Sequence, residues 1–167
     1  MRTLYPILAF ATVTLLAVAT ATGAFADGGK KHFKAELSGY DEVPAISTTG
    51  SGTFDASIDE DTTTITYALT YAGLEGTATT AAHIHFGQPN ANGGVSAFLC
   101  GGDKPACTPG SGTFTGTIEP ADIVGPSAQG IAPGEWAELV QAIRGRVTYA
   151  NVHTNKHPGG EIRGQLR

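Results

Sequence analysis

Residues 63–71 read TTITYALTY, a stretch in which apolar side chains alternate with small or polar ones. Successive side chains of a β-strand point to opposite faces, so a period of two places one apolar face against a core. The β-branched and aromatic residues that fill this stretch also favour strands. It therefore predicts a half-buried strand whose inward side chains are Ile65, Tyr67, Leu69 and Tyr71.

The same alternation recurs along the chain and predicts the fold class. HFKAEL at 32–37 and GTFDASI at 52–58 alternate in this way, and further strands are expected near residues 79–86, 94–99, 111–118, 146–153 and 160–166. Gly, Pro, Asn and Asp cluster between these segments and mark turns. About eight strands, with no regular alternation of strand and helix, predict an all-β antiparallel Greek-key β-sandwich or barrel.

One short amphipathic helix is expected over residues 133–144. Its apolar stripe has helical spacing and consists of Trp136, Leu139, Val140 and Ile143. We expect Pro133 to be its first residue and Gly145 to end it in the left-handed conformation. A single turn of helix is also expected at Pro120.

The first 26 residues have the pattern of a secretory signal peptide. Arg2 precedes an apolar run from Leu4 to Val18, and residues 24–26, AFA, fit an A-x-A cleavage site. The run is shorter than the roughly 20 residues that span a bilayer, and no later segment is long or apolar enough to do so. We therefore expect one mature domain over residues 27–167, secreted or periplasmic, with no membrane span.

The charges exclude two classes of partner. The chain has 10 Lys and Arg against 15 Asp and Glu, and loss of the leader, in which Arg2 is the only charged residue, changes the net charge from −5 to −6. Nucleic acids and anionic membranes favour basic patches, so neither is expected as a partner. Asp41 and Glu42 are interpreted as solvated turn charges, and Glu161 is expected to pair with Arg163 along one strand face.

Two cysteines, Cys100 and Cys107, enclose the loop CGGDKPAC. An exported chain meets an oxidising compartment, so we expect a disulfide between them. Metal or redox chemistry is the alternative, but the six-residue gap does not fit the CxxC spacing of thioredoxin-like motifs.

Two stretches carry histidines in the same arrangement: TAAHIHFG at 80–87 and ANVHTNKHPGG at 150–160. In each, a β-branched residue precedes a histidine, and a Gly-Gly pair follows, at 93–94 after the first stretch and at 159–160 within the second. GSGTF also occurs twice, at 50–54 and 110–114, so the chain is interpreted as a degenerate duplication. The alternative is that GSGTF is merely a common way to enter a strand.

The alternation also indicates where the histidines point. With Ile84 in the core, His83 and His85 lie on the outer face of their strand, and the repeat places His153 equivalently to His85. If the two strands are neighbours, the three imidazoles converge into a site for copper or zinc, with His157 as the nearest candidate for a fourth ligand. Alternatively, each histidine only holds its own loop by a hydrogen bond to a backbone carbonyl.

Four motifs resemble the chordin-type (CHRD) domain: LSGYDEVP at 37–44, AAHIHFGQPNANGGV at 81–95, ADIVGP at 121–126 and YANVHTNKHPGGEIRGQL at 149–166. The resemblance covers about Phe33 to Leu166. It implies an exported, non-enzymatic binding or structural domain whose partner is an unidentified extracellular protein or polysaccharide. The chain has none of the cysteine-rich modules with which chordin holds its ligand, so growth-factor binding is not implied. No hydrolase, P-loop or paired-carboxylate motif assigns a catalytic residue.

A looser likeness leads to the alternative function. An HxH strand, a later histidine and a disulfide in an exported protein are similar to copper–zinc superoxide dismutase. That likeness would make His83, His85 and His153 copper ligands, but no bridging or zinc-binding histidine or aspartate lies between His85 and Cys100. The alternative function is therefore that of a copper- or zinc-binding metalloprotein, and superoxide dismutase activity is the most specific form of this alternative.

Overall fold

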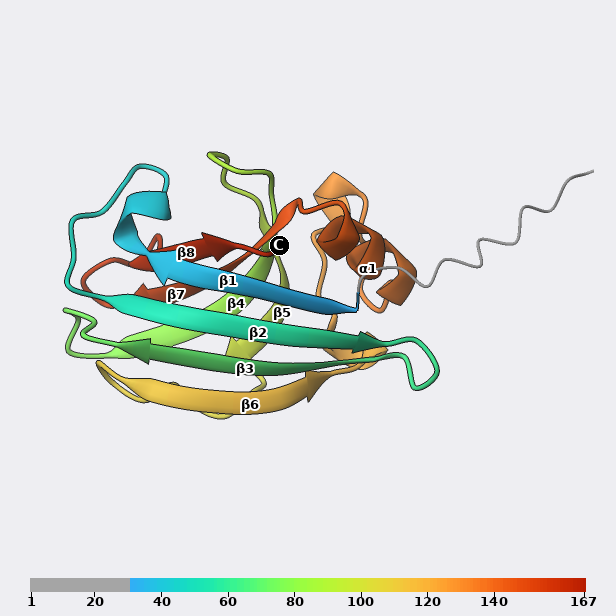
Figure 1. Cartoon of the computed structure of the whole chain (residues 1–167), viewed down its shortest axis with the longest axis horizontal. Coiled ribbons are helices and arrows are strands. Elements are labelled where there is room, and N and C mark those ends of the chain that lie inside the picture. Colours follow the sequence, from blue (N-terminus) through green and yellow to red (C-terminus); the bar gives the residue numbers. More distant parts are fainter. Residues whose placement is uncertain (1–30) are drawn as a thin grey trace, which may run out of the picture.

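The computed structural model describes residues 31–167, and these form one antiparallel sheet with a single α-helix (Figure 1). The sheet order is β5-β4-β7-β8-β1-β2-β3-β6, and the sheet curls into a nearly closed barrel. Its strands are β1 (His32–Ser38), β2 (Ser51–Asp59), β3 (Thr64–Ala72), β4 (Thr79–Phe86), β5 (Gly94–Cys100), β6 (Gly112–Ile118), β7 (Thr148–Thr154) and β8 (Ile162–Gln165). The predicted all-β antiparallel fold of eight strands is confirmed, and its form is the barrel.

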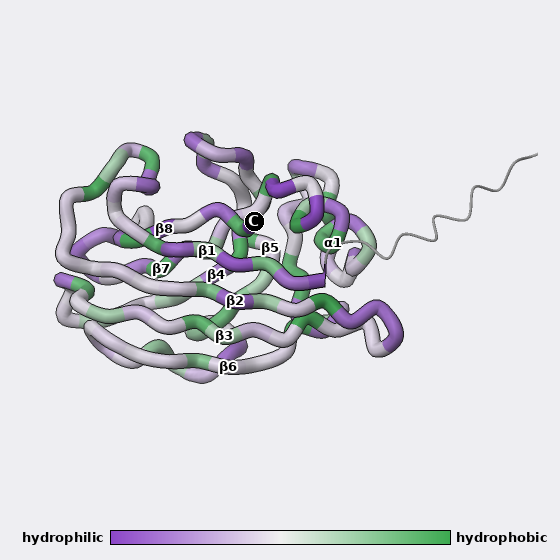
Figure 2. The backbone as a smooth tube through the Cα atoms, viewed as in Figure 1, coloured by the Kyte–Doolittle hydropathy of each residue, from purple (hydrophilic) through white to green (hydrophobic). Residues whose placement is uncertain are grey.

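The TTITYALTY stretch forms β3, which pairs with both β2 and β6. The side chains of Ile65 and Leu69 are completely buried, as the alternation predicts. Leu69 lies opposite Phe54 of β2 and Phe114 of β6, so one apolar row crosses three strands. Figure 2 shows the complementary pattern, with hydrophilic residues gathered in connections such as the turn between β2 and β3.

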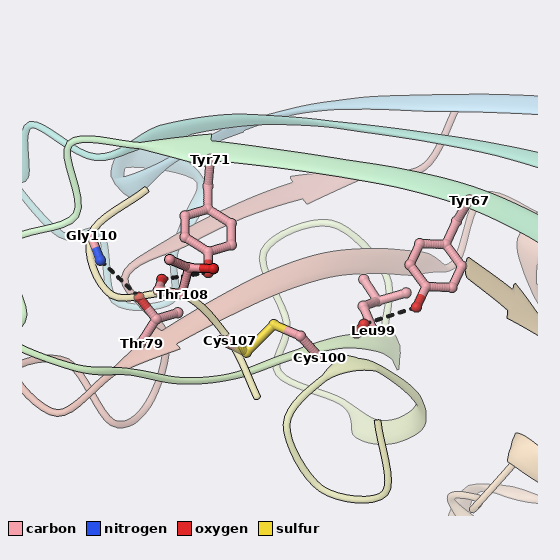
Figure 3. Close-up of a disulfide and its surroundings, with 8 residues drawn as sticks. All are labelled: Tyr67, Tyr71, Thr79, Leu99, Cys100, Cys107, Thr108 and Gly110. Carbon is pink, nitrogen blue, oxygen red and sulfur yellow. Dashed lines mark hydrogen bonds between the residues drawn. A yellow bond between two sulfur atoms is a disulfide. The ribbon is translucent and has the colours of Figure 1, made fainter. Parts of the chain in front are cut away.

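Two tyrosines of β3 reach across the barrel to β5 and to the segment that follows it (Figure 3). The Tyr67 hydroxyl donates to the Leu99 carbonyl of β5 at 2.8 Å, and the Tyr71 hydroxyl donates to the Thr108 carbonyl at 2.7 Å. Each bond satisfies a buried phenol and ties β3 to the chain around β5. The predicted disulfide between Cys100 and Cys107 is present and closes the loop after β5 (Figure 3).

The helix α1 (Trp136–Arg144) begins three residues later than predicted. Gly134 has a positive φ of 84° in a turn in which the Ala132 N–H donates to the Glu135 carboxylate, so the helix cannot include Pro133. Its end also differs, because Gly145 stays right-handed and Arg146 takes the positive φ.

The apolar face of α1 packs on the barrel as predicted. Leu139, Val140 and Ile143 are buried, and Trp136 is partly buried against the same core. Three short 3₁₀ turns complete the secondary structure: Gly39–Asp41, Pro120–Asp122 and Ser127–Gln129. The second confirms the turn expected at Pro120. Within residues 31–167, no helix has the length and apolar character needed to cross a membrane. The leader predicted over residues 1–26 lies outside the described residues.

Candidate metal centre

β4 and β7, the strands that carry His83, His85 and His153, are antiparallel neighbours near the end of the sheet that β5 completes. His83 lies directly opposite Asn151 in their register. His85 is two residues beyond His83, and His153 is two residues beyond Asn151. A local two-fold relation through the His83–Asn151 pair therefore exchanges His85 and His153, which are the residues that the sequence repeat aligns.

The two GSGTF copies do not follow this relation. They begin β2 and β6, and both of these strands pair with β3. The register thus supports the repeat for the histidine strands, whereas duplication of the whole chain stays a hypothesis.

The predicted faces of β4 and β7 are confirmed. Side chains without any exposure point into the core from both strands: Ala82, Ile84, Ala150 and Val152. The histidines lie on the opposite face of the sheet, but loops cover them. Only 8% of His83 and 7% of His85 is exposed. His83 and His85 are therefore covered side chains on the outside of the barrel wall.

Two histidines hold the loops above them. The Nδ1 of His85 bonds the Gly93 carbonyl at 3.0 Å, and the Nδ1 of His153 bonds the Pro158 carbonyl at 3.0 Å. A carbonyl oxygen only accepts, so each Nδ1 must carry the proton and each Nε2 keeps a lone pair. Both Nε2 atoms are buried without a hydrogen-bond partner among the described residues. Loop anchoring therefore accounts for one nitrogen of each ring and leaves the other free.

The third histidine completes a cluster. The Nδ1 of His83 is likewise buried and without a hydrogen-bond partner in the described chain. His83, His85 and His153 each offer a ring nitrogen, and these atoms lie within 4.8 Å of one another. Three points so spaced lie within about 2.8 Å (4.8/√3) of a common centre. Bonds from zinc to imidazole are about 2.0–2.1 Å, so a shift of roughly 1 Å or less per ring would bring the nitrogens to bonding distance.

Burial keeps the three rings neutral. It lowers the pKa of His83 to about 3, and repulsion from the two other imidazoles adds to the effect. Burial also lowers the pKa of His85 to about 4, against the opposing effect of its bond to Gly93. The pKa of His153 is lowered for the same reason, against its bond to Pro158. Neutral imidazole is the form that binds metals.

Aromatic rings and a buried cation surround the cluster. The Phe98 ring meets His83 edge-on with centroids 4.4 Å apart, and the Tyr149 ring stacks in parallel on His85 at 4.8 Å. The Arg163 guanidinium lies 3.5 Å from the centre of the Tyr149 ring. Because β4 and β8 flank β7 on opposite sides, Tyr149 stands between His85 and Arg163.

The expected ion pair between Glu161 and Arg163 is not formed. Arg163 is 2% exposed, and its guanidinium donates to the Ala91 carbonyl at 2.7 Å, which fixes the loop above the site. The Glu161 carboxylate instead accepts from the hydroxyls of Thr48 and Thr154 at 2.7 and 2.6 Å. The loop after β4 therefore satisfies Arg163, whereas Thr48 and the last residue of β7 satisfy Glu161.

Sequence reasoning missed Glu42 and Asn151. The interpretation of Glu42 as a solvated turn charge is wrong, because its side chain is buried and accepts from Asn151 Nδ2 at 2.6 Å. Burial raises the pKa of Glu42 to about 7. One signal was available: Asn151 occupies the position in ANVH that corresponds to His83 in AHIH.

The structure does not bring His157 into the cluster. Its imidazole lies near the carboxylates of Glu75 and Glu161, and it contributes to lowering the pKa of both. The fourth ligand suggested by sequence proximity therefore faces other groups.

Comparison with known proteins identifies the family. The family model of the CHRD domain matches residues 33–166, nearly the whole of the described chain. No curated protein and no solved structure matches the chain. The disulfide between Cys100 and Cys107 is compatible with an extracellular location. The chain belongs to the CHRD domain family.

Proposed function

We propose that this protein is an exported, non-enzymatic binding domain whose ligand is a single copper or zinc ion. His83, His85 and His153 supply the ligands. The observation that carries the proposal is the convergence of three imidazoles, each of which offers a ring nitrogen within 4.8 Å of the others and has a buried ring nitrogen without a hydrogen-bond partner among residues 31–167. A buried polar atom without a partner costs roughly 1–3 kcal/mol, and a metal ion would satisfy all three at once.

The tautomers support this assignment. The bonds from His85 to Gly93 and from His153 to Pro158 place the protons on Nδ1 and leave the Nε2 lone pairs without a hydrogen-bond partner in the described chain. Histidines that bind metals commonly use the second ring nitrogen in this way, because the outer bond fixes the orientation of the ring. Imidazole donors suit both copper and zinc, and the disulfide leaves no thiolate to compete.

Export is part of the proposal. The leader pattern of residues 1–26 and the disulfide both fit an oxidising compartment. We propose that cleavage after Ala26 yields the exported form. Its intact mass tests this step, and a mass that retains the leader would contradict it.

Metal titration followed by elemental analysis tests the site. The exported protein is expected to bind one equivalent of copper or zinc, and His85→Ala is expected to abolish stoichiometric binding. His32→Ala is the matched control, since His32 is an exposed histidine at the start of β1. Binding by His85→Ala with the affinity of the unaltered protein would refute the proposal. His157→Ala is expected to bind normally, because His157 lies outside the cluster.

A further inference from the structure

The candidate ligands carry no negative charge. His83, His85 and His153 form a cluster that no Asp, Glu or Cys joins within the described chain. Both cysteines are consumed by the disulfide. An ion bound here would keep its full charge, because neutral imidazoles neutralise none of it.

A fixed positive charge stands beside this neutral cluster. The Arg163 guanidinium is almost fully buried and stacks on Tyr149, which in turn stacks on His85. Its hydrogen bonds go to the carbonyls of Ala91 and Gln88 and to the side-chain oxygen of Asn92. The buried Glu42 carboxyl interacts with it electrostatically, but no carboxylate among residues 31–167 forms an ion pair with it.

These charges discriminate between ions of different charge. The cost of moving an ion from water into a medium of low dielectric grows with the square of its charge, and repulsion by Arg163 grows in direct proportion. Compared with a monocation, a dication therefore has about four times the desolvation cost and twice the repulsion from Arg163. Coordination number adds to this, since zinc held by three histidines also takes a fourth ligand, commonly water, whereas copper(I) is stable with three.

We propose that the site, if it binds metal as proposed above, is selective for copper(I) over zinc(II) and copper(II). The neutral ligand set and the buried guanidinium of Arg163 set this preference. The aromatic rings of Phe98 and Tyr149 enclose the cluster and keep its surroundings weakly polar.

Competition titrations test the selectivity. Copper(I) is added under anaerobic conditions against bicinchoninate, and zinc(II) and copper(II) are added against chelators of known affinity. We expect the Kd for copper(I) to be at least about 100-fold lower than that for zinc(II), a difference of roughly 2.7 kcal/mol. Equal or tighter binding of either dication, abolished by His85→Ala, would overturn this inference and leave the proposed function standing. Failure of all three ions to bind in a His85-dependent way would overturn both.

Two variants test the source of the selectivity. Arg163→Gln removes the positive charge and is expected to lower the ratio of copper(I) to zinc(II) affinity about tenfold. Glu42→Gln removes a carboxyl group bonded to Asn151, opposite His83, and is expected to raise the ratio. Glu42→Gln keeps an oxygen that can accept from Asn151, so it decides the question where Arg163→Gln does not fold. An unchanged ratio in the folded variants would overturn the electrostatic explanation.

Discussion

The stability of the metal-free domain should fall steeply in mild acid because of His83 and His85. Burial lowers the pKa of these rings to about 3 and about 4, against an ordinary value of 6.5 that applies in the unfolded chain. Between these values the unfolded chain binds protons that the folded chain does not. The free energy of unfolding therefore decreases as the pH falls. The histidine contribution is complete above pH 6.5 and is lost as the pH falls from there toward 4.

The size of the effect follows from the pKa differences. Each pKa unit corresponds to about 1.4 kcal/mol, so each ring lowers the free energy of unfolding by roughly 2–3 kcal/mol by about pH 4.5. Glu42 acts in the opposite direction, because burial raises the pKa of its carboxyl from 4.5 to about 7. As the pH falls, the folded chain takes up this proton before the unfolded chain does, which raises the free energy of unfolding by roughly 2–3 kcal/mol over the same range.

Urea denaturation at two pH values separates these contributions. The unaltered protein, His83→Gln and Glu42→Gln are compared at pH 7 and about 4.5 with a metal chelator present. His83→Gln is expected to lessen the acid-induced loss of stability by roughly 2–3 kcal/mol, and Glu42→Gln to increase it by a similar amount. Parallel losses in the unaltered protein and His83→Gln would refute the reasoning from burial.

Two further predictions concern the fold. Leu139→Ala removes a completely buried side chain from α1 and is expected to lower the free energy of unfolding, measured by urea denaturation, by about 2–5 kcal/mol. The control Gln141→Ala changes an exposed residue of the same helix and is expected to alter that free energy by no more than about 0.5 kcal/mol. Equal stability of the two variants would show that α1 is not packed. Replacing both Cys100 and Cys107 by serine is expected to cost roughly 2–3 kcal/mol through the loop closure that the disulfide provides. An unchanged denaturation midpoint in that double variant would contradict the expectation.

Local patterns predicted the strands because the alternation of side chains is a property of each strand by itself. The burial of Ile65 and Leu69 and the outward direction of His83 and His85 follow from a period of two. Strand order has no such signal. That β7 lies between β4 and β8 depends on packing of the whole sheet, so convergence of the histidines was conditional on an arrangement that the sequence alone did not settle.

The errors concerning Glu42 and Arg163 share a physical cause. Glu42 and Arg163 look like surface charges because their burial depends on partners distant in the chain. Glu42 meets Asn151, 109 residues away, and Arg163 meets the Ala91 carbonyl, 72 residues away. The prediction of the helix start was wrong for a local reason instead, since Gly134 has a positive φ and interrupts the segment that Pro133 would have begun.

The number of histidines in the cluster follows from one broken symmetry. The local two-fold relation that exchanges His85 and His153 would also match His83 with a histidine at position 151, which instead holds asparagine. Asn151 uses its Nδ2 to donate to the Ile162 carbonyl at 2.8 Å and to Glu42, which anchors the loop after β1 on this face. Position 160 beside this pair requires glycine, because the Cβ of any other residue would lie 2.6 Å from both Asn151 and Glu42. The site therefore has three imidazoles because the fourth symmetric position anchors that loop.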